Sequence, residues 1–192
     1  ELINNRKIIK MEINCSSGQR IIKNSLTENI SIYQRTTNKF IHIILPKPRL
    51  FIIGAVHIAQ ALVSIAKIAN YEITLIDPRE HFATKKRFPN CTIINEWPDT
   101  ALANLTLDNA SHIITLTHDP KIDDPALITA LKNDTGYIGS LGSKKTHNLR
   151  CERLRLLGFN KSDLSKIHGP IGLDIKAKTP AEIAISILAE IT

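Results

Sequence analysis

The stretch LFIIGAVHIAQAL, residues 50–62, carries the strongest fold signal in the sequence. Four apolar residues precede Gly54, and apolar residues at helical spacing follow it. This pattern predicts a buried strand over residues 50–53, a tight turn, and a helix over residues 57–70. A strand, a glycine turn and a helix are how a nucleotide-binding βαβ unit begins. In such a unit the amides at the start of the helix are free to bind an anion.

The chain continues to alternate between strand and helix patterns after this unit. Further strands are expected over residues 72–76, 91–94, 112–116 and 137–140. Further helices are expected over residues 82–88, 99–105, 124–133, 144–157 and 180–191. This alternation predicts an α/β fold with a doubly wound, mostly parallel, Rossmann-like sheet. Ligands of such sheets bind at the carboxyl ends of the strands, which selects the loops at residues 54–57, 77–79, 117–120 and 141–145.

A proline segment, residues 46–48, separates this region from the amino-terminal part of the chain. Proline fixes its own φ and restricts the residue before it, so the segment is expected to be an extended linker. Short alternating runs precede it, including residues 7–13, 30–33 and 40–45. We therefore expect a partial β-rich segment with its linker over residues 1–48 and the Rossmann-like domain over residues 49–192.

Composition narrows the classes of ligand. The formal net charge is +7 and aromatic residues make up 5% of the chain, with no interleaving of basic and aromatic side chains. This balance suits an anionic cofactor, and we expect no nucleic acid partner. No apolar run approaches the ~18 residues of a membrane span, so no membrane partner is expected either. Three cysteines without a Cys-x-x-Cys pair predict no metal site, and reduced thiols favour a cytoplasmic location.

Asp77 ends the second predicted strand, roughly 20 residues after Gly54, where the dinucleotide fingerprint places an acidic residue. There a carboxylate accepts hydrogen bonds from ribose hydroxyls. It would also repel a 2′-phosphate, so NAD is favoured over NADP as a ligand. The alternative is a sheet turn with a solvated aspartate.

Three polar residues, Thr117, His118 and Asp119, follow the fourth predicted strand. His118 and Asp119 could form an imidazole–carboxylate pair for acid–base work or for a ligand contact. Alternatively, Asp119 caps a turn before Pro120 and His118 stays partly exposed. Asp123 is expected to cap the next helix.

The segment YIGSLGSKKTHNLR, residues 137–150, combines glycines, hydroxyls and basic side chains at the end of the fifth strand. Its candidate ligand residues are Gly139, Ser140, Gly142, Ser143, Lys144, Lys145 and His147. Together they predict a second anion site, facing the first across the sheet. Lysines in the first turn of a helix oppose its dipole, which favours a bound anion. The alternative is a solvated basic helix face. No catalytic constellation is present.

Five stretches taken together resemble the carboxyl-terminal domain of the XdhC/CoxI family over about residues 49–192. They are IGAVHIAQAL, LIDPREHFATKKRFP, LTHDPKIDDPAL, YIGSLGSKKTHNLRCERLRLLGF and IHGPIGLDIKAKTPAEIAISILAEI. The resemblance implies a Rossmann-like domain in a maturation factor for molybdenum hydroxylases such as xanthine dehydrogenase. Such factors bind molybdenum cofactor, present it to a cysteine desulfurase for sulfuration, and pass it to the apo molybdenum hydroxylase. They are chaperones rather than enzymes, and a homodimer is implied.

The resemblance also implies cofactor-binding positions in this chain. These are Gly54, His57, Asp77, His118, Asp119, Gly139, Ser140, Gly142, Ser143, Lys144, Lys145, Thr146 and Gly169. The family loop normally has Gly-Ala-Gly-His, and here Val56 replaces the second glycine. A β-branched residue tolerates positive φ poorly, so the anion is expected at residues 139–145, with His57 as the main polar group of the first loop.

Two alternative functions use the same residues. The first is an NAD-binding oxidoreductase, which Asp77 supports, whereas Val56 and the absence of a catalytic constellation oppose it. The second is a partner-docking domain whose ligand site has decayed, with the long basic helix over residues 144–157 as its docking surface.

Overall fold

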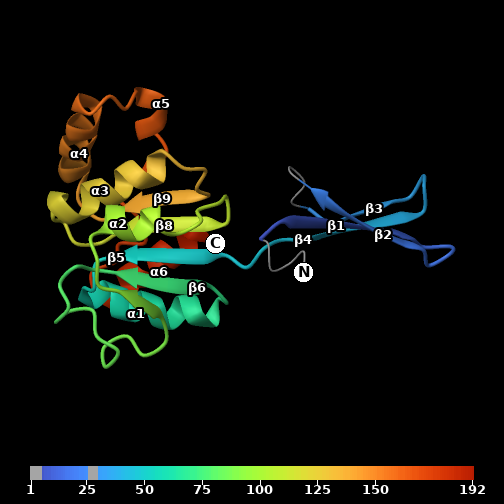
Figure 1. The fold of residues 1–192 in the computed structure, drawn as a ribbon, viewed down its shortest axis with the longest axis horizontal. Coiled ribbons are helices and arrows are strands. Elements are labelled where there is room, and N and C mark those ends of the chain that lie inside the picture. The colour runs from blue at the N-terminus through green and yellow to red at the C-terminus, as the bar shows by residue number, and fades with distance from the viewer. Residues whose placement is uncertain (1–5, 26–29) are drawn as a thin grey trace. The chain divides into compact units, whose positions relative to one another are not determined.

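The computed structural model describes residues 6–25 and 30–192 (Figure 1). The chain divides into two compact units, Glu1–Lys47 and Pro48–Thr192. None of the described helices is long and apolar enough to span a membrane.

The first unit is an antiparallel sheet with the strand order β2-β1-β4-β3. Its strands are β1 (Ile8–Asn14), β2 (Arg20–Ser25), β3 (Ile32–Gln34) and β4 (Lys39–Ile44). Ile41 and Ile43 alternate along β4 and are buried together with Ile9 of β1, as expected for a strand with one covered face. The sequence did not predict β2, because all but the last of its residues are exposed.

The second unit holds a parallel sheet with the order β10-β9-β8-β5-β6-β7, which confirms the predicted fold class. Its strands are β5 (Arg49–Ile53), β6 (Glu72–Ile76), β7 (Thr92–Ile94), β8 (Ser111–Thr115), β9 (Tyr137–Ser140) and β10 (Ile167–His168). Ile53 at the end of β5 lies opposite Ile76 on one side and Thr115 on the other. The three central strands therefore end at one edge, and their loops meet there.

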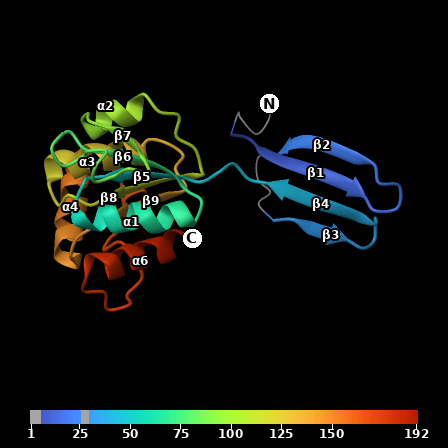
Figure 2. The ribbon, with the colours of Figure 1, turned by 90° about the horizontal axis from the view of Figure 1, so that it is seen from below.

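Helices cover both faces of this sheet. They are α1 (His57–Ile68), α2 (Pro98–Ala103), α3 (Pro120–Leu131), α4 (Lys144–Leu156), α5 (Lys161–Leu164) and α6 (Pro180–Ile191). Figure 2 shows α1 and α6 on one face and α2 and α3 on the other. Leu50 and Ile52 of β5 pack with the first pair, and Phe51 and Ile53 pack with the second. Burial on both faces explains why β5 is continuously apolar.

Two predicted helices differ in the structure. Residues 82–88 form separate turns instead of a helix, because their backbone amides bond to two different carbonyls, those of Arg79 and Thr84. Pro89 also disfavours helical backbone at the residue before it. Helix α3 begins at Pro120 rather than at residue 124, because Asp119 caps it and accepts a hydrogen bond from the Lys121 amide at 2.9 Å. Asp123 lies inside this helix, so its predicted capping role was wrong.

Candidate functional site

The strands β5 and β8 are neighbours in the sheet, and the order in which the chain adds strands reverses between them. The loops that follow these two strands meet at this point. From β5 the chain runs to α1 on one face, and from β8 it runs to α3 on the other. Sheets of this kind bind their ligands at the edge where the chain direction reverses in this way. Gly54 has φ +109°, and a Cβ added to it would lie 2.5 Å from Cγ2 of Thr117. Both the conformation and the space require glycine here.

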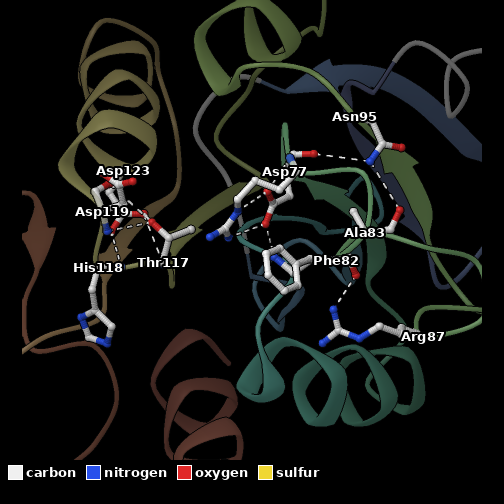
Figure 3. A network of polar contacts seen from close by, with 11 residues as sticks. Asp77, Phe82, Ala83, Arg87, Asn95, Thr117, His118, Asp119 and Asp123 are labelled. Atoms are coloured by element: carbon white, nitrogen blue, oxygen red, sulfur yellow. Dashed lines mark hydrogen bonds and ion pairs between the residues drawn. The ribbon is translucent and has the colours of Figure 1, made fainter.

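Asp77 follows β6 at the same edge of the sheet (Figure 3) and is completely buried. Its carboxylate accepts a hydrogen bond from the Ala55 amide at 2.8 Å. It also accepts bonds from the Arg79 amide at 2.9 Å and from the Arg79 guanidinium at 2.9 and 2.7 Å. Burial alone would raise the pKa of this carboxyl, but these bonds together hold the pKa below its ordinary value. The Asp77 carboxylate oxygens, which the sequence predicted as acceptors for ribose hydroxyls, therefore already accept hydrogen bonds from within the protein.

A pocket of about 380 Å³ opens beside α1. It is lined by Ala55, Val56, His57, Arg79, His81, Phe82 and Arg87. Val56 has φ −87° and ψ 176° and forms the N-cap position of α1. The expected conflict between a β-branched residue and positive φ is therefore absent at Val56, and its half-buried side chain forms part of the pocket wall instead.

The loop after β8 folds around Asp123 rather than around His118. The Asp123 carboxylate accepts hydrogen bonds from the Thr117 hydroxyl at 2.7 Å and from the His118 amide at 3.1 Å. The exposed His118 has φ +63°, and its imidazole points away from Asp119 and Asp123 (Figure 3). The structure thus shows the capping alternative and not an imidazole–carboxylate pair.

The carboxyl end of β9 leads into the first turn of α4. Ser143 caps this helix and accepts a hydrogen bond from the Thr146 amide at 3.1 Å. Lys144 and Lys145 are exposed in the first turn. Ser140 lies deeper, fully buried, and shares a hydrogen bond with the hydroxyl of Thr115. The predicted ligand residues here therefore separate into an exposed group at the start of α4 and a buried group inside the sheet.

Three glycines of the predicted set remain, and Gly139 and Gly169 make close packing contacts, while Gly142 has φ +148° in the bend before α4. A Cβ on Gly139 would collide with the side chains of Tyr137 and Ile171, and a Cβ on Gly169 would collide with the ring of His147. The glycine at 169 thus lets the loop after β10 lie directly against α4. These contacts give both glycines a structural role, and their predicted ligand role stays a prediction.

Arg150 of α4 is a residue of this site that the sequence did not single out. It is only 2% exposed, and one guanidinium nitrogen donates a hydrogen bond to the Leu141 carbonyl at 3.0 Å. Its Nε and Nη1 atoms are buried without a partner among the described residues. Burial lowers the pKa of Arg150, and the charges of Asp123 and Asp124 offset this in part. The only sequence clue is its helical spacing from the buried Leu154.

The described residues contain no group of three His, Cys, Asp or Glu side chains arranged as a metal site.

Comparison with known proteins gives consistent matches. A family model described as the XdhC Rossmann domain matches residues 50–191. The chain is 32% identical over 146 residues to the molybdenum cofactor insertion chaperone PaoD of Escherichia coli K12, covering 76% of this chain and 40% of that protein. It is 30% identical over 174 residues to a probable xanthine dehydrogenase subunit of Bacillus subtilis 168, covering 90% of this chain and 51% of that protein.

A solved structure matches nearly the whole length of the chain. The crystal structure of a xanthine dehydrogenase from Bacillus halodurans matches with a TM-score of 0.77 and 26% identity, over 98% of this chain and 62% of that chain. The chain spans about half or less of the length of the two curated relatives. The family match covers nearly all of the unit with the parallel sheet, so the chain belongs to the XdhC family and this unit is its XdhC Rossmann domain.

Proposed function

We propose that this protein is a maturation factor that binds molybdenum cofactor at the carboxyl edge of the parallel sheet. In this proposal it presents the cofactor to a cysteine desulfurase for sulfuration and passes it to an apo molybdenum hydroxylase such as xanthine dehydrogenase. Two relatives, named as a molybdenum cofactor insertion chaperone and as part of a probable xanthine dehydrogenase, support a role of this kind. A homodimer is the assembly that the family resemblance implies.

The observation that carries the proposal is the cationic first turn of α4. Lys144 and Lys145 are exposed in the first helical turn, behind the Gly142–Ser143 bend, and the buried Arg150 lies beneath the same loop. The pterin cofactor carries a phosphate, and a helix N-terminus with added lysines stabilises an anion. The protein's own residues would bind and orient this cargo; no step of bond making is assigned to them.

An NAD-binding oxidoreductase is the weaker alternative. The Asp77 carboxylate that would accept hydrogen bonds from an NAD ribose is held by Arg79 and Ala55. The docking-only alternative differs in predicting no ligand at all.

Cofactor binding by the full chain tests the proposal. The protein is mixed with purified molybdenum cofactor under anaerobic conditions, and the bound pterin is measured by its fluorescence after oxidation. Loss of two charged contacts should weaken binding at least about tenfold in the double variant Lys144→Ala, Lys145→Ala. Arg155→Ala is the matched control, because Arg155 is exposed in the last turn of the same helix; its affinity should stay within about twofold of wild type.

Hand-over is measured separately, as the activity gained by a purified apo molybdenum hydroxylase. Cofactor binding that is equal in the double variant and the wild type would contradict the proposed site. NAD binding without cofactor binding would favour the oxidoreductase. Co-purification with the apo-enzyme without any ligand would favour the docking domain.

A further inference from the structure

Helix α4 has an outer face that the proposed function leaves largely unused. Five of the thirteen residues of this helix are basic and one is acidic. Its inner side is fixed by Leu154, which is fully buried in the core, and by Arg153, which donates two hydrogen bonds to the Asp124 carboxylate of α3. The opposite side faces away from the core (Figure 1) and is therefore available to a partner.

Two leucines dominate this outer face. Leu149 is 47% exposed and Leu156 is 89% exposed. They are seven residues apart in the helix, so they lie on one side of it, two turns from each other. Glu152, which is also exposed, lies between them on the same side. A leucine pair at heptad spacing on an exposed face is typical of a helix that packs against a second helix.

Cations lie at both ends of this pair. Lys145 comes four residues before Leu149, and Arg155 is adjacent to Leu156; both cations are exposed. Within the described part of the chain, neither of them lies within ion-pair distance of a carboxylate. The outer face of α4 is thus an apolar stripe with uncompensated positive charge around it. Its complement is an apolar stripe surrounded by carboxylates.

Charge and shape argue against two other occupants. A second copy of this chain would bring the same cations to the contact, and like charges across an interface are unfavourable. An anionic membrane would attract Lys145 and Arg155, but a helix in a membrane interface buries a broad apolar face. Here Glu152 stands between the two leucines, where it would be pressed against anionic headgroups. A partner helix needs only a narrow stripe of contact.

We infer that the outer face of α4 binds an acidic amphipathic helix of a partner protein. Apolar side chains of that helix pack against Leu149 and Leu156, and its carboxylates pair with Lys145 and Arg155. Glu152 selects a partner that places a basic or polar residue at the centre of the contact. Leu149, Leu156 and Arg155 have no part in the proposed cofactor site, so this inference is tested separately from it.

A peptide of designed sequence is the probe. It has about three heptads, with one leucine in each, glutamates on both sides of the leucines and a lysine opposite Glu152. Its fluorescence anisotropy is followed at low salt as the full chain is added. Saturable binding is expected, and it should weaken as added salt screens the charges. A second peptide with serine in place of each leucine keeps the charges and should bind at least about tenfold more weakly.

Variants of the chain locate the contact on α4. Leu156→Asp should weaken peptide binding at least about tenfold, because it removes apolar burial and adds a charge of the same sign as the peptide. Arg155→Glu should weaken binding about fivefold or more. A peptide with lysines in place of the glutamates should reverse this order and bind Arg155→Glu more tightly than the wild type. Lys161→Glu, an exposed charge reversal in α5, is the matched control and should stay within about twofold.

Four results would overturn the inference. Saturable binding of the leucine peptide could be absent, or the serine peptide could bind equally well, which would mean attraction by charge alone. A Leu156→Asp variant with an unchanged thermal unfolding temperature could bind the leucine peptide as well as the wild type does. Finally, Leu156→Asp could leave peptide binding intact and abolish self-association or binding to phosphatidylserine vesicles, which would assign the face to a second copy or to a membrane.

Discussion

Two aspartates at the same edge of the sheet behave in opposite ways. Asp77, after β6, and Asp123, in the first turn of α3, are both at most 1% exposed. The pKa of Asp77 lies below its ordinary value, whereas burial raises the pKa of Asp123. Burial acts on both in the same direction, so the difference lies in their partners.

Asp77 has a cation in direct contact, and Asp123 does not. Arg79 donates two guanidinium hydrogen bonds to Asp77. Asp123 accepts its bonds from the Thr117 hydroxyl and from backbone amides, while Arg150 bonds to the Leu141 carbonyl instead. The hydrogen bonds that Asp77 accepts, with those from Arg79 foremost, therefore outweigh its burial, whereas the charge of Arg150 offsets the burial of Asp123 only in part.

The largest expected effect that tests this comparison is that of Asp77→Ala. Removing Asp77 leaves the Arg79 charge uncompensated and the Ala55 amide unbonded, so the unit should lose about 3 kcal/mol of stability. This loss is near the low end of the ~3–5 kcal/mol that breaking a buried ion pair usually costs. The Arg79 side chain is 37% exposed, so solvent screens its charge. Asp123→Ala should cost less, about 1 to 2 kcal/mol, because its ionised form is already penalised.

Urea unfolding followed by fluorescence measures both losses, since Trp97 is the single tryptophan and lies at the start of α2 in this unit. Asp99→Ala, an exposed substitution in α2, is the control and should change stability by less than about 1 kcal/mol. An Asp123→Ala loss larger than that of Asp77→Ala would break the comparison.

A double-mutant cycle gives the next effect in size. We expect a coupling energy of about 1 to 2 kcal/mol between Asp77 and Arg79, from the variants Asp77→Asn and Arg79→Met. For Asp123→Asn and Arg150→Met the coupling should stay below about 1 kcal/mol, because no hydrogen bond joins the pair. The same urea experiment provides the four free energies of each cycle, and equal couplings would contradict the assigned difference in partners.

The smallest effect is the pH dependence of stability. Asp77 contributes stability above its unfolded pKa of about 3.9, and this is lost as the pH falls through its lower folded pKa. For Asp123 the folded state binds the proton more tightly, so stability falls as the pH rises from about 3.9 through the folded pKa. Carbon-13 NMR of labelled aspartate carboxyls measures both directly, and Asp77→Asn and Asp123→Asn assign the resonances. Titration of both on the same side of 3.9 would refute the assignment.

Periodicity and turn chemistry were sufficient to predict the fold class of the second unit, although not the short elements α5 and β10. Strand β5 and the turn after it could be recognised from a local pattern, the apolar run at residues 50–53 followed by a glycine. The start of α6 at Pro180 could be recognised locally in the same way. The burial of Arg150 and the partners of Asp123 depend on contacts between α3, α4 and their loops. Such contacts join residues far apart in the chain, and no local pattern contains them.

The same limit applies to the pocket. Arg87 and Phe82 belong to a segment that was predicted as helical, but its backbone amides bond within two separate turns. Asp77 was located correctly at the end of β6, but its engagement by Arg79 depends on the conformation of the two residues that follow it.

The missing side chain at Gly54 has a consequence for the route of any ligand. Thr117 fills the space where a Cβ would be, so the loops after β5 and β8 touch and leave no passage between them. This contact separates the edge of the sheet into a part beside α1 and a part beside α4. A molecule that reaches from the α1 side to the α4 side must arch over it, and a short rigid molecule is confined to one side.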